Sequence, residues 1–420
     1  MFRFIHAADL HLDSPLKRLE CYEGAPVKEV RQATRRALKN LVDLALEVRA
    51  GFVCFSGDLY DADWKDYNTG LFFISQMARL GEAGIRFFVV SGNHDAANAM
   101  TRKLRLPDSG FSFPADRPGT VVLDDLRTAI HGQGYDRPAV TENLALGFPA
   151  PVPGYFNIGM LHTCLCGYNG HEPYVPCTES DLELRGYDYW ALGHVHKRQI
   201  IRQQPFIGFP GNLQGRHVRE PGAKGCFLVE VDDGGGCSVE FRAMDTVRWQ
   251  RVGVDVGAAE NAHGAVDMAV DGVEQCLEGS EGRTVVVRLE LGGDCPALQD
   301  MSTRLEHWTG EIRSRCLSRL GSRVMVEKVT FVYRVDHIPA GGTVLPEGPL
   351  DELRNVLSEL RSHPERLEAD IADLKKLSRA LPPDYFDDVF LDPENPDWLE
   401  KRLAETAPFL LQRLKTGEDG

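Results

Sequence analysis

The stretch from residue 52 to residue 63, FVCFSGDLYDAD, constrains the fold of this chain more than any other. Residues 52–55 are apolar and rich in strand formers, which predicts a strand buried on both faces. Small residues and then Asp58 follow, so this carboxylate is expected at the carboxyl end of the strand, where ligands bind in open α/β sheets. Asp61 and Asp63 come next, and carboxylates this close repel one another unless a cation lies between them.

The same arrangement, an apolar strand that ends in polar side chains, recurs along the first half of the chain. Strands are expected at residues 2–8, 52–55, 86–90, 158–161 and 188–192, with helices at 28–48 and 71–80. The polar residues that follow these strands are Asp9, His11, Asp58, Asn93, His94, Asp95, His162, His194 and His196. Alternating strands and helices with polar strand ends predict a layered α/β domain with a site at its rim.

These polar side chains suit a metal centre. Residues two apart on extended backbone point the same way, so Asp9 with His11, and His194 with His196, can each reach one ion. Imidazole, carboxylate and amide ligands without thiolate suit manganese, iron or zinc. There are more candidates than one ion needs, which favours two ions that share a carboxylate. Such a pair generates a hydroxide and stabilises both oxygens of an in-line displacement at phosphorus.

Taken singly, each of these residues also has an ordinary structural interpretation. A histidine at a strand end is more often a packing residue than a ligand, Asp58 alone could cap a helix, and Asn93 alone could hold a turn. The ordered series DxH, GDxxD, GNHD, a single His, and GHxH is what carries the prediction.

This series resembles the calcineurin-like metallophosphoesterases. The resemblance implies a four-layer α/β/β/α sandwich in which Asp58 bridges two ions. It implies that Asp9, His11, Asp58 and His196 hold one ion, and that Asp58, Asn93, His162 and His194 hold the other. His94 would face the scissile phosphate as an acid or charge stabiliser, with Asp95 orienting its ring.

Within that superfamily, the opening HAADLHLDSP, the GDLYD form and the segment GNLQGRH are similar to DNA-repair exonucleases of the SbcD type, especially the shorter bacterial YhaO-like branch. Archaeal and eukaryotic relatives carry a histidine three residues after the bridging aspartate, where this chain has Asp61. The exonuclease role of that position therefore does not transfer. Arg216 and His217, in a basic loop after the last ligands, are candidate phosphate contacts, with a solvated basic loop as the alternative.

The remainder of the chain predicts a second domain and a tail. We expect boundaries at 1–245 for the metallophosphoesterase domain, 246–340 for an α+β cap domain of βαβαβ order, and 349–415 for a helical tail. Leucines at three-four spacing in the tail fit either core packing or the grip of a coiled coil. In the SbcD-type family such helices bind the SbcC-type ATPase, which makes an ATPase of this kind the expected partner; a homodimer is left open.

Composition narrows the partners. The net charge is −15, which opposes an extended polyanion-binding surface, but residues 347–420 contain 18 acidic and 10 basic residues and so hold about half of the excess. No apolar run is long enough to span a membrane and no signal peptide is recognisable, so we expect the cytoplasm. The ten cysteines, including the pair Cys164 and Cys166, read as reduced thiols, with a zinc site at this pair as the less favoured alternative.

Together these features predict a dinuclear enzyme, with manganese as the expected metal, that hydrolyses DNA phosphodiesters as an exonuclease or endonuclease in DNA repair. A phosphodiesterase or phosphatase of small nucleotides is the rival enzyme, since the core motifs do not distinguish substrates. A scaffold that binds DNA ends is the rival outside catalysis, but a vestigial site would be expected to have lost at least one ligand.

Overall fold

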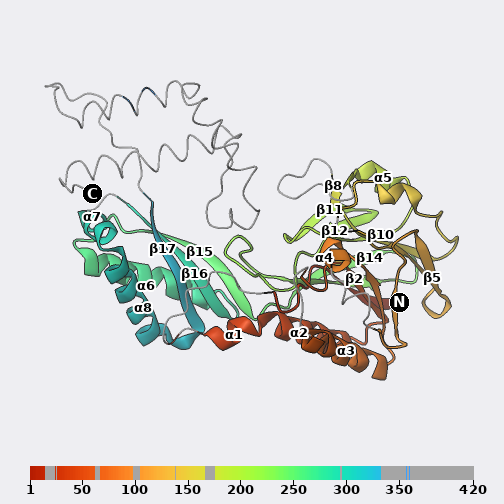
Figure 1. The fold of residues 1–420 in the computed structure, drawn as a ribbon, viewed down its shortest axis with the longest axis horizontal. Helices are drawn as coiled ribbons and strands as arrows, with labels where there is room; N and C mark the ends of the chain where they lie inside the picture. Colours follow the sequence, from red (N-terminus) through yellow and green to blue (C-terminus); the bar gives the residue numbers. More distant parts are fainter. Residues whose placement is uncertain are drawn as a thin grey trace. The chain divides into compact units, whose positions relative to one another are not determined.

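The computed structural model describes residues 1–14, 24, 26–61, 67–97, 105–137, 139–165, 176–293, 296–332, 356 and 359 (Figure 1). Apart from residues 356 and 359, the predicted helical tail at 349–415 lies outside the described residues, and so does Cys166. Residue contacts divide the chain into two compact units. One contains Met1–Val252, Val270–Leu289 and Thr309–Val329, and the other contains Gly253–Ala269, Glu290–Trp308 and Thr330–Gly420. The domain boundaries expected from the sequence stay predictions.

Two six-stranded sheets form most of the first unit. The first has the order β14–β13–β1–β2–β3–β4, with bounds Cys237–Ala243, Gly225–Val231, Phe2–Ala7, Phe52–Ser56, Arg86–Val90 and Gly110–Ser112. The second has the order β11–β12–β10–β7–β6–β5, with bounds Gln199–Gln203, Phe206–Phe209, Tyr189–Gly193, Phe156–His162, Thr128–Gln133 and Gly119–Leu123. Strands β1 to β4 are parallel, and so are β6, β7, β10 and β12, so the carboxyl ends of each set lie at one edge of its sheet.

Alternation of side chains along the strands of the first sheet builds two separate cores. In β1, Phe4 belongs to the cluster shared with the second sheet, whereas Ile5 belongs to the cluster beneath the helices. Phe52 and Val53 of β2 divide in the same way. Strands buried on both faces therefore read as continuous apolar runs, which is the pattern that the sequence shows.

Helices cover the outer face of the first sheet. The helices of the first half of the chain are α1 (Val27–Arg31), α2 (Ala33–Glu47), α3 (Tyr67–Glu82), α4 (Asn93–Ala97) and α5 (Glu179–Glu183). Helices α2 and α3 lie side by side (Figure 1), and they share a core cluster with the odd-numbered residues of β1 and β2. The single helix expected at 28–48 is interrupted at Gln32, which separates α1 from α2.

The outer face of the second sheet is covered differently. Trp190 and Ile207 pack there against Leu182 of α5 and against residues near the 3-10 helix η3 (Leu144–Gly147). The described residues also contain two shorter 3-10 helices, η2 (Asp124–Leu126) and η4 (Gly321–Arg323). A separate two-stranded sheet consists of β8 (Cys164–Leu165) and β9 (Pro176–Cys177). The expected α/β class is confirmed, although the regular helix in this fourth layer has only five residues in the described part.

The order after residue 246 is βαβααβ, so the second helix of the expected βαβαβ unit is divided into two. This part of the chain consists of β15 (Val247–Asp255), α6 (Ala262–Glu278), β16 (Thr284–Gly292), the helices α7 (Pro296–Thr303) and α8 (Leu305–Leu320), and β17 (Val324–Val332). The three strands form a sheet in the order β15–β16–β17. Among the described residues, no helix is long and apolar enough to cross a lipid bilayer.

Candidate metal centre

The predicted ligands gather where the carboxyl ends of the two large sheets meet. The hydroxyl of Ser56, the last residue of β2, donates to the carbonyl of Ala191 in β10 at 2.9 Å, which joins the sheets at this edge. The backbone N–H of His194 donates to both carboxylate oxygens of Asp9, at 3.1 and 3.2 Å. The ends of β1, β2 and β10 are therefore held together by hydrogen bonds that include a candidate ligand.

Glycines in the motifs leave room for these side chains. A Cβ at Gly92 would lie 2.2 Å from Oδ1 of Asp58, and one at Gly193 would lie 1.8 Å from the carbonyl oxygen of Ser56. Gly57 has a φ of +92° and a Cβ there would lie 2.3 Å from Nδ1 of His162. The glycines that precede the ligands in GD, GNHD and GHxH are thus required by close approach.

The backbone at several candidate ligands is left-handed. The φ angles are +52° at Asp9, +41° at His11, +52° at Asp58 and +102° at His194, although none of these residues is glycine. Such conformations are costly and persist where surrounding structure enforces them, which is frequent at functional sites.

Three groups of side chains bring potential ligand atoms within 4.8 Å of one another. They are Asp9 with His11 and His196, His11 with Asp58 and His94, and Asp9 with Asp58 and His162. Asp9 is 1% exposed and Asp58 is 2% exposed, and each belongs to two groups, so the arrangement can serve more than one ion. Of the predicted ligands, these groups contain Asp9, His11, Asp58, His162 and His196.

The other two predicted ligands flank the third group. Nδ1 of His162 donates to the carbonyl of Ser56 at 2.9 Å, which leaves Nε2 at 3.1 Å from the amide oxygen of Asn93 and 3.4 Å from Oδ2 of Asp58. The rings of His162 and His194 have centroids 5.1 Å apart. Asn93 and His194 therefore lie beside His162, with which the resemblance groups them as ligands of one ion. Their roles as ligands stay predictions.

The side chain of His94 is 37% exposed, whereas those of His11 and His162 are fully buried. Its ring centroid lies 4.9 Å from that of His11, and its Nδ1 lies 3.7 Å from Oδ1 of Asp61. Its backbone N–H donates to Oδ1 of Asp58 at 3.0 Å, which fixes the chain at this point. An exposed imidazole at the rim of a buried donor cluster is placed to meet a substrate.

Asp95 has a structural role that the sequence did not predict. Its carboxylate accepts hydrogen bonds from the backbone N–H groups of Leu59, Tyr60 and Gly92, at 3.1 to 3.2 Å. Burial and the nearby charge of Asp58 raise the pKa of Asp95 to about 7. These bonds hold the loop that carries Asp58, while the expected role of Asp95 in orienting the ring of His94 stays a prediction.

Two carboxylates behind the histidines were not selected from the sequence as site residues. Glu220, 6% exposed, lies 2.7 Å from Nδ1 of His196, and Asp61 lies 2.6 Å from Nδ1 of His11. The side chain of Arg216 is 17% exposed and contacts Asp61 at 3.2 Å and Glu220 at 3.5 Å. His217 is more exposed and lies 3.7 Å from Glu220. The guanidinium is therefore engaged inside the site, and the substrate roles of Arg216 and His217 stay predictions.

The buried charges of the site attract a cation. Burial opposes ionisation of Asp58, but the imidazoles of His162 and His11 outweigh this and hold the pKa of Asp58 well below its usual range. Burial also lowers the pKa of His162, but the carboxylates of Asp58 and Asp9 outweigh it and raise that pKa to about 9. The two carboxylates thus stabilise positive charge beside them, whether a proton or a divalent ion carries it.

The donor set fits divalent ions of intermediate hardness. Neutral imidazole nitrogens and carboxylate oxygens suit manganese, iron and zinc, and the donor groups among the described residues contain no thiolate. Cys164 is buried next to His162 in the sequence, and the described cysteines are free thiols. This agrees with the interpretation of Cys164 as a packing residue, whereas Cys166 lies outside the described residues.

Comparison with known proteins adds a family. The model of the calcineurin-like phosphoesterases matches residues 2–198, and the model of the middle domain of metallophosphoesterase YhaO matches residues 249–334. The chain is 36% identical to an uncharacterized metallophosphoesterase YhaO of Bacillus subtilis over 297 residues, which cover 70% of this chain and 72% of the relative.

Two further proteins are more distantly similar to the chain. The chain is 26% identical to the DNA double-strand break repair protein Mre11 of Methanopyrus kandleri over 276 residues, which cover 59% of this chain and 58% of the relative. A solved dimetal phosphatase from Danio rerio aligns with a TM-score of 0.37 at 12% identity over 58% of this chain and 96% of that chain, a likeness too low to support an argument.

Proposed function

The chain belongs to the calcineurin-like metallophosphoesterase family, and on this premise we propose that it hydrolyses DNA phosphodiester bonds with two divalent ions, manganese being the first to test. The single observation that supports the chemistry best is the buried cluster in which Asp9 and Asp58 each belong to two donor groups. DNA as the substrate is supported by the similarity to archaeal double-strand break repair proteins, whose sequences are matched over little more than half of their length.

The side chains divide the work of such a reaction. When bound, two divalent ions would lower the pKa of a water molecule and neutralise charge on the phosphate. Asp9, His11, Asp58, Asn93, His162, His194 and His196 would hold the ions. His94, exposed at the rim and 3.7 Å from Asp61, would donate a proton or hydrogen bond to the leaving oxygen. Asp95 holds the loop of Asp58 through three backbone N–H groups.

The biological setting is a further part of the proposal. The predicted ATPase partner would bind through residues 349–415, nearly all of which lie outside the described residues. The free thiols of the described cysteines fit a reducing compartment such as the cytoplasm.

The test is hydrolysis by the full chain after metal removal and after addition of Mn²⁺. Labelled single-stranded and duplex DNA are compared with bis-p-nitrophenyl phosphate and a cyclic nucleotide. His94→Ala is the site variant, and His307→Ala, which removes an exposed histidine of α8, is the matched control. We expect DNA cleavage that requires Mn²⁺ and that falls by about 10²- to 10⁴-fold in His94→Ala only.

The other outcomes discriminate between the rival functions. Cleavage of the small esters without cleavage of DNA would transfer the proposal to a phosphodiesterase of small nucleotides. Inertness toward every substrate by a protein that binds two ions would favour a scaffold that binds DNA ends.

A further inference from the structure

Three charged side chains lie in a row behind the ligand histidines, and we call them the Asp61–Arg216–Glu220 row. Nη1 of Arg216 lies 3.2 Å from Oδ1 of Asp61, and Nη2 lies 3.5 Å from Oε1 of Glu220. Each carboxylate in turn contacts the Nδ1 atom of a different histidine of the site, His11 or His196. One arginine therefore connects the two carboxylates that support two candidate ligands.

Glu220 determines which nitrogen of His196 faces the donor cluster. Its Oε2 accepts hydrogen bonds from Nδ2 of Asn212 at 2.7 Å and from the backbone N–H of Arg216 at 2.8 Å. Its Oε1 lies 2.7 Å from Nδ1 of His196. A carboxylate can only accept, and its contact is shorter than the 3.3 Å from Nη2 of Arg216 to the same nitrogen, so we place the hydrogen on Nδ1; Nε2 then faces Oδ1 of Asp9, 3.8 Å away.

Asp61 has the same effect on His11. Its Oδ1 lies 2.6 Å from Nδ1 of His11, so this nitrogen donates and Nε2 faces the cluster. The two Nε2 atoms of His11 and His196 lie 3.1 Å apart. When each ring places its hydrogen on Nδ1, two lone pairs face each other at this distance. These lone pairs repel each other unless a cation lies against both. A carboxylate that accepts from one nitrogen of a histidine whose other nitrogen binds a metal ion is a recurrent arrangement in proteins.

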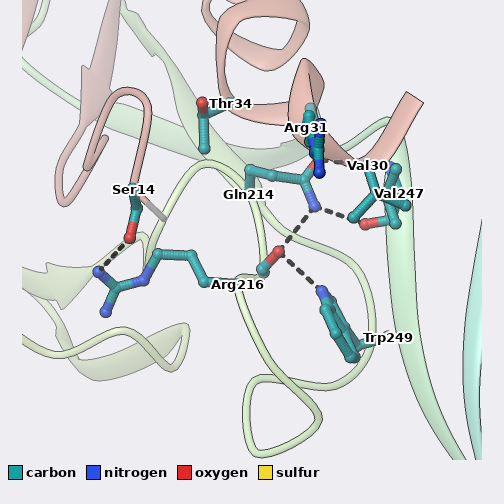
Figure 2. Close-up of a pocket in the computed structure, with 10 residues that line it drawn as sticks. Ser14, Val30, Arg31, Thr34, Gln214, Arg216, Val247 and Trp249 are labelled. Atoms are coloured by element: carbon teal, nitrogen blue, oxygen red, sulfur yellow. Dashed lines mark hydrogen bonds between the residues drawn. The ribbon is translucent and has the colours of Figure 1, made fainter. Parts of the chain in front are cut away.

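The position of Arg216 is fixed by its own loop. Figure 2 shows its guanidinium reaching Ser14, whose hydroxyl lies 3.5 Å from Nη1. The indole N–H of Trp249 donates to the carbonyl of Gly215 at 2.9 Å, and the side chain of Gln214 accepts from the backbone N–H of Thr246 at 2.9 Å. This anchoring keeps a guanidinium that is 17% exposed between its two carboxylates and away from solvent.

We propose that Asp61, Arg216 and Glu220 are positioning residues for one of the two ions, the ion that Asp9, His11 and His196 hold. The inference rests on the proposed function for the presence of ions, but it concerns binding of an ion and not hydrolysis. It assigns Arg216 to the metal centre and not to the substrate. It also gives a function to Asp61, the position at which related nucleases carry a histidine.

The test is calorimetric titration of the metal-free full chain with Mn²⁺, which gives an affinity for each ion. Glu220→Gln replaces one accepting oxygen by an NH₂ group, which then faces the donor of His196 or the donors of Asn212 and Arg216. We expect this substitution to lower the affinity for one ion by about 10- to 100-fold and to leave the affinity for the other ion unchanged. Asp61→Asn and Arg216→Met should weaken the same ion, and Arg216→Lys should retain more affinity than Arg216→Met.

The matched control is Glu230→Gln, which removes a carboxylate of β13 that pairs with Arg3 on the surface and should leave both affinities unchanged. The unaffected ion reports that each variant is folded. If Glu220→Gln does not fold, Asp61→Asn tests the same prediction at a less buried side chain.

Three results would overturn the inference: wild-type affinities in Glu220→Gln, Asp61→Asn and Arg216→Met, an equal loss of affinity for both ions, or weaker binding of different ions in Asp61→Asn and Glu220→Gln. A wild-type chain that binds two ions but cleaves no phosphodiester refutes the proposed function and leaves this inference standing. A wild-type chain that binds no ion refutes both.

Discussion

His6 is a buried imidazole that joins the two large sheets, and it makes the stability of the fold depend on pH. Its Nε2 donates to the carbonyl of Leu192 in β10 at 3.0 Å, so its Nδ1 accepts from the hydroxyl of Tyr189, also at 3.0 Å. This is the pattern of the neutral ring, and burial disfavours the protonated one. Burial lowers the pKa of His6 from 6.5 to about 3, although the Leu192 carbonyl partly opposes this.

The direction of the effect follows from proton uptake. Between pH 6.5 and about pH 3 the unfolded chain binds a proton at His6 and the folded protein does not. The free energy of unfolding therefore decreases as the pH falls through this window, by about 1.4 kcal/mol per pH unit. From pH 7 to pH 5 the contribution of this one residue is about 2 kcal/mol.

The perturbation is His6→Gln, whose amide offers a donor and an acceptor but does not titrate. Urea unfolding of both proteins is measured at pH 7 and pH 5 in the presence of EDTA, which removes metal ions. The metal ligands then titrate in the same way in both proteins, so their contribution cancels when the two are compared. We expect the stability lost between the two pH values to be smaller in the variant by about 2 kcal/mol. His307→Gln, at an exposed position of α8, should lose as much as the wild type. An equal loss in His6→Gln and wild type would refute the reasoning.

Two further predictions concern the packing of the site. Gly193→Ala places a Cβ 1.8 Å from the carbonyl oxygen of Ser56, so thermal unfolding should show a free energy of unfolding lower by at least about 2 kcal/mol. The control is Gly253→Ala, which has no neighbour within 4 Å and should change this free energy little. Comparable decreases in the two variants would contradict the close approach at Gly193. Asp95→Asn puts an NH₂ group against the backbone N–H groups of Leu59, Tyr60 or Gly92, so urea unfolding should show a free energy of unfolding lower by about 1 to 3 kcal/mol. The control is Asp125→Asn, at an exposed side chain, which should lose almost none of this free energy. A loss in Asp95→Asn no larger than that of the control would show that these bonds do not stabilise the loop.

Much of the fold was predictable because the buried strands are visible in the sequence as apolar runs. The apolar runs at 52–55 and 86–90 correspond to β2 and β3 because residues buried on both faces must all be apolar. The break of the first helix at Gln32 was missed, since the apolar stripe continues through it and Gln is an ordinary helix residue. The irregular course of the described segments that cover the second sheet was not predicted, because segments such as those that bury Phe148 and Tyr187 have no periodicity to read.

The candidate ligands were predictable and their supports were not, for a physical reason. A ligand such as Asp58 follows a strand within a few residues, so its position along the chain gives its position in space. Glu220 lies 24 residues from His196, in a loop whose course no local pattern determines. A buried carboxylate with four partners and an exposed one look the same in a sequence, and only the fold separates them.

Arg216 shows why the sign of a local charge run is a poor guide to its partner. The sequence left open whether the basic loop beside the site contacts phosphate or is solvated; in the structure Arg216 faces Asp61 and Glu220, and Nζ of the buried Lys224 donates to the carbonyl of His196 at 2.8 Å. Both cations contact groups of the site, in a chain whose net charge is −15. Positive charge for a polyanionic substrate would then come from the bound ions more than from these two side chains. Removal of the ions should then weaken substrate binding as well as turnover, which is a consequence that a purely catalytic role for the ions does not share.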